Sequence, residues 1–175
     1  MTAVEAYELT THGGATDFAQ VIAACESFGP YCLIGGLAVN CYVEPVYTLD
    51  ADIVVIASRL SDLSGYLEAH GFKTEEHPHS VNAAPPGSQI RIQFTTDERY
   101  QAFLPRSIEA EVLGIRVRIA CLEDVTHGKL CAYSDPRRRL SKRKKYELDL
   151  IRLAEAYPQL TSEYPRELVD ELDRG

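Results

Sequence analysis

Two short segments, each at the boundary of an apolar run, constrain the fold of this chain more than any other part of its sequence. Gly35-Gly36 follows the apolar run 31–34, and Asp50-x-Asp52 opens a run rich in Ile and Val. Short apolar runs bounded by turn residues predict buried strands. The sequence therefore places a glycine turn after one strand and a pair of acids at the start of the next.

The acid pair predicts a cation site. Residues i and i+2 of a strand point to the same face and lie about 6.5–7 Å apart, so Asp50 and Asp52 present neighbouring carboxylates. Hard divalent cations such as Mg²⁺ or Mn²⁺ prefer oxygen ligands and share them with substrate phosphates. The alternative is a pair of solvated acids with no ligand, because Asp-x-Asp alone is common.

The glycine pair predicts a phosphate site or a tight turn. Without Cβ atoms, Gly35 and Gly36 let the backbone approach a phosphate, and a following helix N-terminus offers free N–H donors. The sequence contains neither GxxxxGK nor GxGxxG, so P-loop and Rossmann-type sites lack their defining residues.

The rest of the pattern predicts a mixed order of strands and helices. Residues 1–15 show no clear periodicity and are expected to form a weakly ordered lead-in, with Asp17 as the N-cap of the first helix. Expected helices cover 17–27, 37–42, 60–70, 122–133, 141–157 and 165–172. Expected strands cover 31–34, 49–57, 72–77 and 89–95, with a hairpin or a bent strand pair over 109–120 and a loop over 77–87. The expected fold class is α+β: a mixed sheet flanked by helices over residues 1–120, and a helical C-terminal subdomain over 121–175.

This layout resembles the nucleotidyltransferase superfamily with the DNA polymerase β-type fold. The segments Leu33-Ile34-Gly35-Gly36-Leu37-Ala38-Val39 and Thr48-Leu49-Asp50-Ala51-Asp52-Ile53-Val54-Val55 are similar to its hG[GS]xA…DxD signature. Weaker motifs resemble the abortive-infection (AbiEii/AbiGii toxin-like) branch, namely 114–120, Leu122-Glu123-Asp124, Gly128-Lys129 and Lys144-Lys145-x3-Asp149-Leu150. The resemblance extends from about residue 30 to residue 155.

The resemblance implies a Mg²⁺-dependent transfer of a nucleoside monophosphate from a nucleoside triphosphate to a hydroxyl on RNA (such as tRNA), a protein or a small molecule. It implies that Asp50 and Asp52 bind the metal, that Gly35-Gly36 with Thr48 holds the triphosphate, and that Lys129 neutralises phosphate charge. It also implies a toxin of a toxin–antitoxin pair, with a cognate antitoxin as partner. An ordinary surface lysine is the alternative for Lys129.

The sequence departs from the superfamily pattern where a third carboxylate is expected. The matching strand face carries Arg91, Gln93 and Thr95. The Gln93 amide can support a metal ligand or a water but lacks the charge that helps a hydroxyl lose its proton, and Arg91 can instead face the phosphates. Three alternatives follow: another acid takes the role of the third carboxylate, catalysis is slow, or the domain no longer catalyses. The candidate acids for the first alternative are Asp97, Glu109 and Glu111.

The second departure is Tyr146, where the branch often carries an Asp after the paired lysines. Asp149 remains, and its spacing predicts an i,i+4 surface ion pair with Lys145. Seven cations fall within residues 137–145 of a chain whose net charge is −8. This basic run, including Arg143 and Lys145, is expected to bind a triphosphate or an RNA acceptor, the alternative being a solvated helix face.

Composition narrows the remaining possibilities. The five cysteines form no CxxC pair and are expected to be reduced. His77 and His79 lie in a Pro-rich loop, which favours the alternative that they form no metal site. No apolar run approaches the ~18 residues that span a bilayer, and no signal layout is present, so we expect a cytoplasmic protein without membrane contact. The competing functions are a catalytically weak or inactive module that binds nucleotide or RNA, and an interaction protein with an acidic tail.

Overall fold

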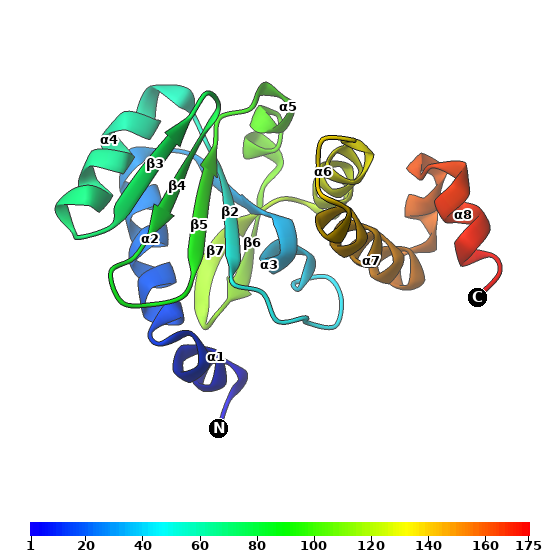
Figure 1. Ribbon diagram of the computed structural model, residues 1–175, viewed down its shortest axis with the longest axis horizontal. Coiled ribbons are helices and arrows are strands. Elements are labelled where there is room, and N and C mark those ends of the chain that lie inside the picture. Colours follow the sequence, from blue (N-terminus) through cyan, green and yellow to red (C-terminus); the bar gives the residue numbers. More distant parts are fainter.

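A seven-stranded mixed sheet with helices on both faces forms the centre of the computed structural model, which describes residues 1–175 (Figure 1). The strands are β1 (Tyr31–Ile34), β2 (Asp50–Val55), β3 (Lys73–His77), β4 (Ser80–Ala84), β5 (Arg91–Thr95), β6 (Ile108–Val112) and β7 (Ile115–Ile119). Their spatial order is β3-β4-β5-β2-β1-β7-β6. β2 is antiparallel to β1 and parallel to β5, and this places the N-terminal halves of β2 and β5 side by side.

The helices are α1 (Ala3–Thr11), α2 (Gly14–Phe28), α3 (Gly35–Val39), α4 (Ala57–Ala69), α5 (Glu98–Gln101), α6 (Leu122–Ser134), α7 (Leu140–Ala156) and α8 (Arg166–Leu172). Short 3₁₀ turns cover Leu104–Arg106 and Pro158–Glu163. Figure 1 shows α6, α7 and α8 in succession to one side of the sheet, so the two ends of the chain lie far apart. None of these helices is both long and apolar enough to cross a bilayer.

Two hydrophobic cores, one on each face of the sheet, hold these layers together. Alternate side chains of β2 enter different cores. Ala51 and Ile53 are fully buried in the core that includes α2 and α4, whereas Val54 is buried in the core that includes α6 and α7. Asp50 and Asp52 have the parity of Val54 and therefore face the C-terminal helices. The strand period thus directs both acids toward α6 and α7.

The N-terminal expectation was wrong. Residues 3–11 form α1, which begins with a capping box between Thr2 and Glu5, and α2 begins at Gly14 with Gly13, not Asp17, as its N-cap. The capping box satisfies two backbone donors at the N-terminus, those of Thr2 and Glu5, and this helps a segment without marked amphipathic periodicity to form a helix.

The expected loop over 77–87 was wrong in part, because residues 80–84 form β4 between β3 and β5. Its sequence, Ser-Val-Asn-Ala-Ala, has little intrinsic strand preference. Hydrogen bonding to β3 on one side and to β5 on the other stabilises it as a strand. The other expected strands, the hairpin and the three C-terminal helices are present with small shifts at their ends. All five cysteines are free, and Cys25 and Cys32 are buried.

Candidate functional site

Gly35 and Asp52 are in direct contact at the junction of β1, α3 and β2. Ile34 pairs with Asp52 across the two strands, so the glycine turn lies beside the carboxylate. Gly35 has φ +74°, in the left-handed region, and a Cβ on it would collide with Asp52 Oδ2. A Cβ on Gly36 would meet the Thr48 side chain at an ordinary 3.5 Å. Only the first glycine is therefore required by this geometry.

Asp50 is surrounded by three cations. Arg91 Nε donates to its Oδ1 at 2.7 Å, and the ammonium groups of Lys142 and Lys145 lie 3.5 and 3.6 Å from its Oδ2. Partial burial raises the pKa of this carboxyl, but the Arg91 hydrogen bond and the lysine charges outweigh burial, so its pKa is lowered overall. Thr48 Oγ1 accepts from the Asp50 backbone N–H at 3.2 Å and lies 3.4 Å from Lys145 Nζ.

Asp52 has the opposite environment, because no protein group donates a hydrogen bond to its carboxylate. Burial raises its pKa, and the negative charge of Asp50 adds to the increase, whereas the nearby Lys129 opposes it. The site thus contains one carboxylate, Asp50, that contacts three cations, and a second, Asp52, that has no hydrogen-bond or ion-pair partner. Since a partly buried carboxylate without a partner is costly to ionise, an added cation at Asp52 would be stabilising.

Lys129 is a buried lysine. Its side chain is 6 % exposed, its Nζ lies 2.6 Å from Asp149 Oδ2, and it stands 5.2 Å above the centre of the Tyr146 ring. The lysine–aspartate contact is a close ion pair without hydrogen-bond geometry at that oxygen. The other oxygen of Asp149 accepts from Arg152 at 2.9 Å. The expected Lys145–Asp149 surface pair was therefore wrong: Asp149 faces inward, and Lys145 turns to Asp50.

Gln93 lies beside Asp52 because β5 pairs in parallel with β2. Its Nε2 donates to Asn82 Oδ1 at 3.1 Å, an interaction that β4 makes possible. Of the alternative acids, Glu109 and Glu111 lie on β6 at the far edge of the sheet, away from β2. Asp97 lies near the site but is held by Arg99.

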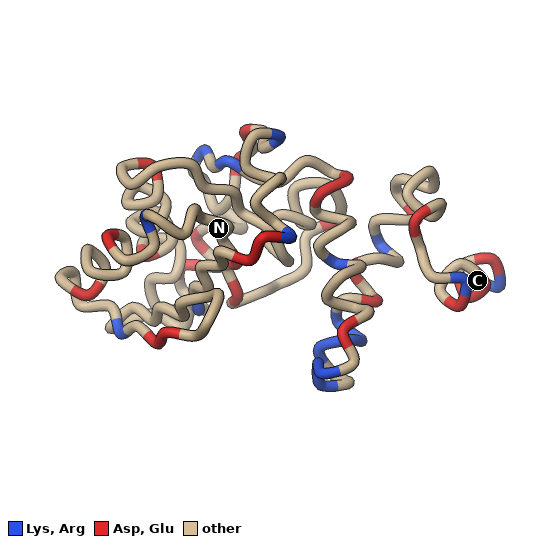
Figure 2. Tube along the Cα trace, turned by 90° about the horizontal axis from the view of Figure 1, so that it is seen from above, with Lys and Arg blue, Asp and Glu red and all other residues tan.

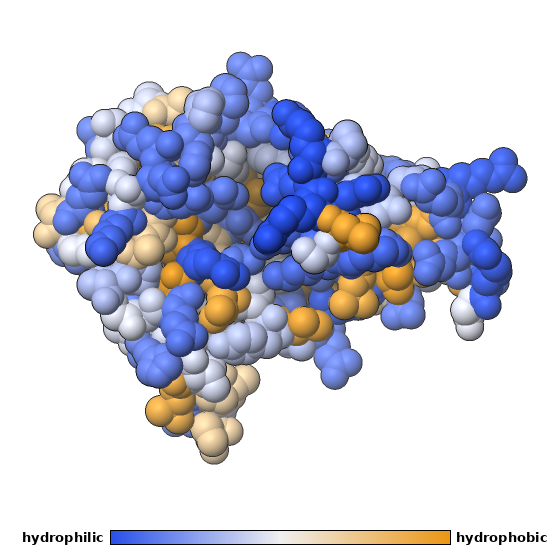
Figure 3. Space-filling model, in the orientation of Figure 1, coloured by the Kyte–Doolittle hydropathy of each residue, from blue (hydrophilic) through white to orange (hydrophobic).

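Two adjoining hollows extend from this centre. The Lys142 groove, of about 420 Å³, contains Gly36, Thr48, Asp50, Arg91, Lys142 and Lys145, and the Asp97 cavity, of about 210 Å³, contains Gly35, His79, Thr95, Asp97, Arg99 and Tyr100. Both are lined by Asp52, Gln93, Lys129, Arg138 and Tyr146, so they meet at the unpaired carboxylate. Figure 3 shows strongly hydrophilic side chains gathered around this hollowed region, between the sheet and the C-terminal helices.

The basic run divides between the site and the surface. Figure 2 shows the cations concentrated at the end of α7 that follows α6. Arg138, Lys142 and Lys145 line the Lys142 groove. Arg143 instead donates to the Tyr133 carbonyl at 3.2 Å and lines neither hollow, and Lys144 pairs with Glu147. The structure thus brings together every expected site residue except Arg143.

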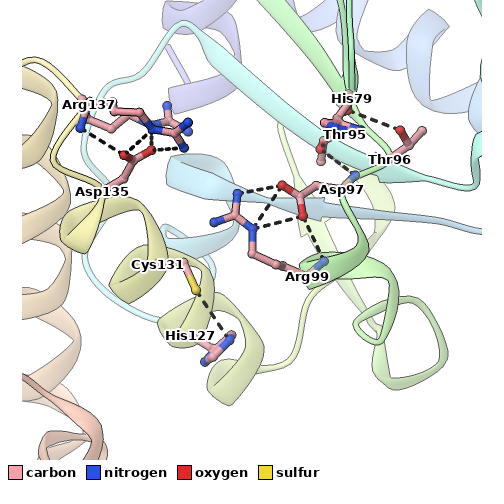
Figure 4. A network of polar contacts seen from close by, with 10 residues as sticks. His79, Thr95, Thr96, Asp97, Arg99, His127, Cys131, Asp135 and Arg137 are labelled. Carbon is pink, nitrogen blue, oxygen red and sulfur yellow. Dashed lines mark hydrogen bonds and ion pairs between the residues drawn. The ribbon is translucent and has the colours of Figure 1, made fainter.

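Sequence reasoning missed several residues of the site. Asn82 lay in the expected loop, and only the pairing of β4 places it beside Gln93. Lys142 and Arg138 belonged to the basic run but had no signal that separated them from their neighbours. Arg99 was also missed; it forms a bidentate pair with Asp97, one of the expected candidate acids, just after β5, with Arg99 Nη2 2.7 Å from Asp97 Oδ2 (Figure 4). No cluster of three or more acidic, histidine or cysteine side chains is present.

Comparison with solved structures identifies the fold. ANT(2'')-Ia in complex with adenylyl-2''-tobramycin is 18% identical, with a TM-score of 0.59 over 90% of this chain and 93% of that one. An antigenic nucleotidyltransferase-like protein from Paracoccidioides brasiliensis is 17% identical, with a TM-score of 0.53 over 91% and 92%. JHP933 from Helicobacter pylori is 16% identical, with a TM-score of 0.55 over 89% and 69%. No family model and no curated protein matches the sequence. The chain therefore has the mixed α/β nucleotidyltransferase fold expected from its sequence.

Proposed function

We propose that this chain, which has the nucleotidyltransferase fold, binds a nucleoside triphosphate with a divalent cation and transfers its nucleoside monophosphate to an acceptor. One observation carries the proposal: the Lys142 groove gathers five cations around two carboxylates beside a glycine turn. The five are Arg91, Lys129, Arg138, Lys142 and Lys145. These five cations exceed the two carboxylates, Asp50 and Asp52, by three positive charges. The excess is two when Asp149, which pairs with Lys129, is also counted. Like charges at this density repel one another, and a triphosphate relieves that repulsion.

Asp50 and Asp52 fit a divalent cation. Asp52 offers oxygens that no protein donor occupies, and the absence of a third acid leaves coordination positions for phosphate and water oxygens, as Mg²⁺ prefers. A bound Mg²⁺ or Mn²⁺ would supply charge neutralisation and alignment of the phosphates. If Asp50 held the metal, the ammonium groups of Lys142 and Lys145 would be free to bind phosphate oxygens instead.

The cations, rather than a helix terminus, hold the phosphates. α3 has five residues, too few for a substantial macrodipole. Lys129 reaches the junction of both hollows from α6, and its Asp149 partner keeps its ammonium in place there. Gly35 brings its backbone against Asp52, which leaves the carboxylate accessible from the cleft.

The biological role that we propose is that of a toxin in a toxin–antitoxin pair, with RNA (such as tRNA) or a protein as the source of the acceptor. The motifs around Lys129 and Asp149 that resemble the AbiEii-like branch support this proposal. ANT(2'')-Ia, solved in complex with adenylyl-2''-tobramycin, illustrates that the fold also accommodates small adenylylated molecules. A helical unit 121–175 that closes over a core 1–120 is consistent with α6 and α7 supplying Lys129, Lys142 and Lys145.

A non-catalytic nucleotide-binding module is the second candidate, and Gln93 beside Asp52 is the observation that favours it. One experiment separates the two. The wild type and Asp50→Ala/Asp52→Ala are incubated with Mg²⁺, each α-labelled nucleoside triphosphate and a cell lysate that includes tRNA. Asp170→Ala/Asp173→Ala, which removes two exposed acids near the C-terminus, is the matched control.

Transfer predicts label on an acceptor with wild type and control but not with Asp50→Ala/Asp52→Ala. Nucleotide binding by calorimetry without any labelled product would instead support the module. Absence of both binding and label would refute the two candidates together.

A further inference from the structure

Transfer to a hydroxyl requires a group that removes its proton, and Gln93 does not supply one. Gln93 occupies the strand position beside Asp52, and a neutral amide is not a base. In the proposed reaction both Asp50 and Asp52 are engaged with the divalent cation, and no other carboxylate lines the Lys142 groove. A base for the acceptor must therefore line the Asp97 cavity, which adjoins Asp52 and Gln93.

Asp97 and the two tyrosines of the Asp97 cavity are poor bases. Asp97 accepts from Arg99 Nε at 3.1 Å and from Arg99 Nη2 at 2.7 Å, and these hydrogen bonds lower the pKa of its carboxyl. Burial raises the pKa of Tyr100 and of Tyr146, so both hydroxyls keep their protons near neutral pH. None of these three groups takes a proton readily from a neutral hydroxyl.

The cations of the cavity already carry their protons and have partners. Lys129 lies 2.6 Å from Asp149, and Arg138 Nε lies 3.8 Å from Asp135. The imidazole of His79 also lines the cavity, and its ring nitrogens make no hydrogen bond or ion pair. His79 is therefore the one titratable side chain of the cavity, besides the metal-binding carboxylate, that is free to act on an acceptor.

The main chain of His79 is fixed at the tip of the β3–β4 hairpin. Its carbonyl accepts from the Thr96 backbone N–H at 3.0 Å and from the hydroxyls of Thr95 and Thr96 at 3.4 and 3.3 Å (Figure 4). The pKa of Asp97 is lowered by the Arg99 hydrogen bonds and, to a smaller extent, by the charge of His79, so the ring and this carboxylate are close. The backbone is thus held in place while the exposed ring keeps its nitrogens available.

The Asp97 cavity connects His79 to the reacting corner. Asn82 is the β4 residue opposite Gln93, and His79 precedes it by three residues, which span about 10 Å of strand. The cavity bridges this interval, because Asp52 and Gln93 line it as well as His79, and its volume is about 210 Å³. A round cavity of that volume is about 7 Å across, so a hydroxyl inside it reaches the imidazole directly or through one water.

We propose that His79 is the general base of the reaction and accepts the proton of the acceptor hydroxyl. This inference rests on the proposed transfer. The hydroxyl oxygen forms a bond to the α-phosphorus while its proton moves to the unprotonated imidazole nitrogen. The bond from that phosphorus to the oxygen bridging the β-phosphate breaks, and pyrophosphate leaves with the electron pair. The Asp97 carboxylate favours the imidazolium that forms, and the exposed ring then returns its proton to water.

The role of His79 predicts a pH profile with a plateau. The charged and titratable groups that face it across the cavity are Asp52 from β2, Asp97, Arg99 and Tyr100 after β5, Lys129 from α6, Arg138 before α7 and Tyr146 from α7. His77, on the same hairpin, turns instead to Asn82 and Glu75. An imidazole changes charge between about pH 5 and 8, and only its neutral form accepts a proton. The wild-type rate is therefore expected to rise about tenfold per pH unit in acid and to level off above about pH 7.5.

The test compares the wild type with His79→Gln. Each is incubated with Mg²⁺, α-labelled nucleoside triphosphate and a cell lysate that includes tRNA, and initial labelling rates are measured from about pH 5.5 to 9. His79→Gln is expected to label at least about a hundredfold more slowly at pH 7, and its rate should rise with pH without a plateau, because hydroxide then replaces the base. His70→Gln, at the exposed end of α4, is the matched control and should behave as wild type.

Nucleotide binding separates a base from a residue that only supports the site. In calorimetry with Mg²⁺ and the triphosphate, His79→Gln is expected to bind within about twofold of wild type, because the role of His79 concerns the acceptor alone. Loss of labelling together with loss of nucleotide binding would show that His79 maintains the fold or the nucleotide site, and would overturn the inference.

Two further results would overturn the role of His79 and leave nucleotide transfer intact. The first is labelling by His79→Gln within about threefold of wild type at pH 7. The second is a pH profile without a plateau in the wild type, or one with the same plateau in His79→Gln. If the wild type labels no acceptor at any pH, the proposed transfer is refuted, and the role of His79 with it.

Discussion

The buried pair of Lys129 and Asp149 allows a quantitative prediction. Their side chains are 6 % and 7 % exposed, their charged atoms lie 2.6 Å apart, and Arg152 contacts the same carboxylate at 2.9 Å. At an effective dielectric constant of ~20, charges at this separation attract by about 6 kcal/mol. Asp149→Asn keeps the side-chain volume but leaves two cations without their anion. Removal of one partner of a buried pair costs about 3–5 kcal/mol, and the second cation places this variant toward the upper end.

The assay is urea unfolding followed by circular dichroism. With a slope of about 2 kcal/mol per M, the Asp149→Asn midpoint is expected to fall by about 1.5–2.5 M relative to wild type. Asp170→Asn, on the exposed face of α8, serves as the control and is expected to change the free energy of unfolding by less than about 0.5 kcal/mol.

A double variant, Lys129→Met/Asp149→Leu, distinguishes the cost of leaving a charge unpaired from the cost of changing the packing. Replacing both charges with apolar groups removes their desolvation cost, so this variant is expected to be more stable than Asp149→Asn, although Arg152 still loses a partner. The reasoning is refuted if Asp149→Asn costs less than about 1 kcal/mol, because the pair would then be solvated rather than buried. It is also refuted if the double variant is less stable than the single one.

Three further predictions follow from the site. Gly35→Ala is expected to destabilise the protein by about 1–3 kcal/mol, because its Cβ meets Asp52 in a left-handed conformation, whereas Gly36→Ala in α3 is expected to be neutral or stabilising in the same urea titration. Since the folded pKa of Asp52 is raised, its ionised form costs stability; Asp52→Asn is expected to raise Tm at pH 7, and calorimetry should show the gain shrinking as pH falls toward about 4. Lys145→Ala is expected to weaken nucleotide binding about tenfold in isothermal titration, because Lys145 lines the groove. Lys144→Ala is the control and is expected to weaken binding less than about twofold, because the Lys144 ammonium pairs with Glu147 at 2.8 Å and does not line the groove.

The local geometry of the acid pair was predictable from sequence. A period of two along a strand places Asp50 and Asp52 on one face wherever that strand lies, and a glycine turn after a buried strand needs no long-range information. The assignment of the nucleotidyltransferase fold followed from these two segments and their spacing. These features depend on neighbours within a few residues, where backbone stereochemistry leaves few choices.

The tertiary structure alone decided which charges meet. Seven cations in nine residues look alike in sequence, but the direction of α7 sends Lys142 and Lys145 to Asp50 and Arg143 to the Tyr133 carbonyl. Asp149 has a lysine four residues before it, yet it pairs with Lys129 on a different helix. Burial explains this choice: a close charge pair excluded from water is much stronger than a helix-surface pair, and the packing of α6 on α7 creates that exclusion.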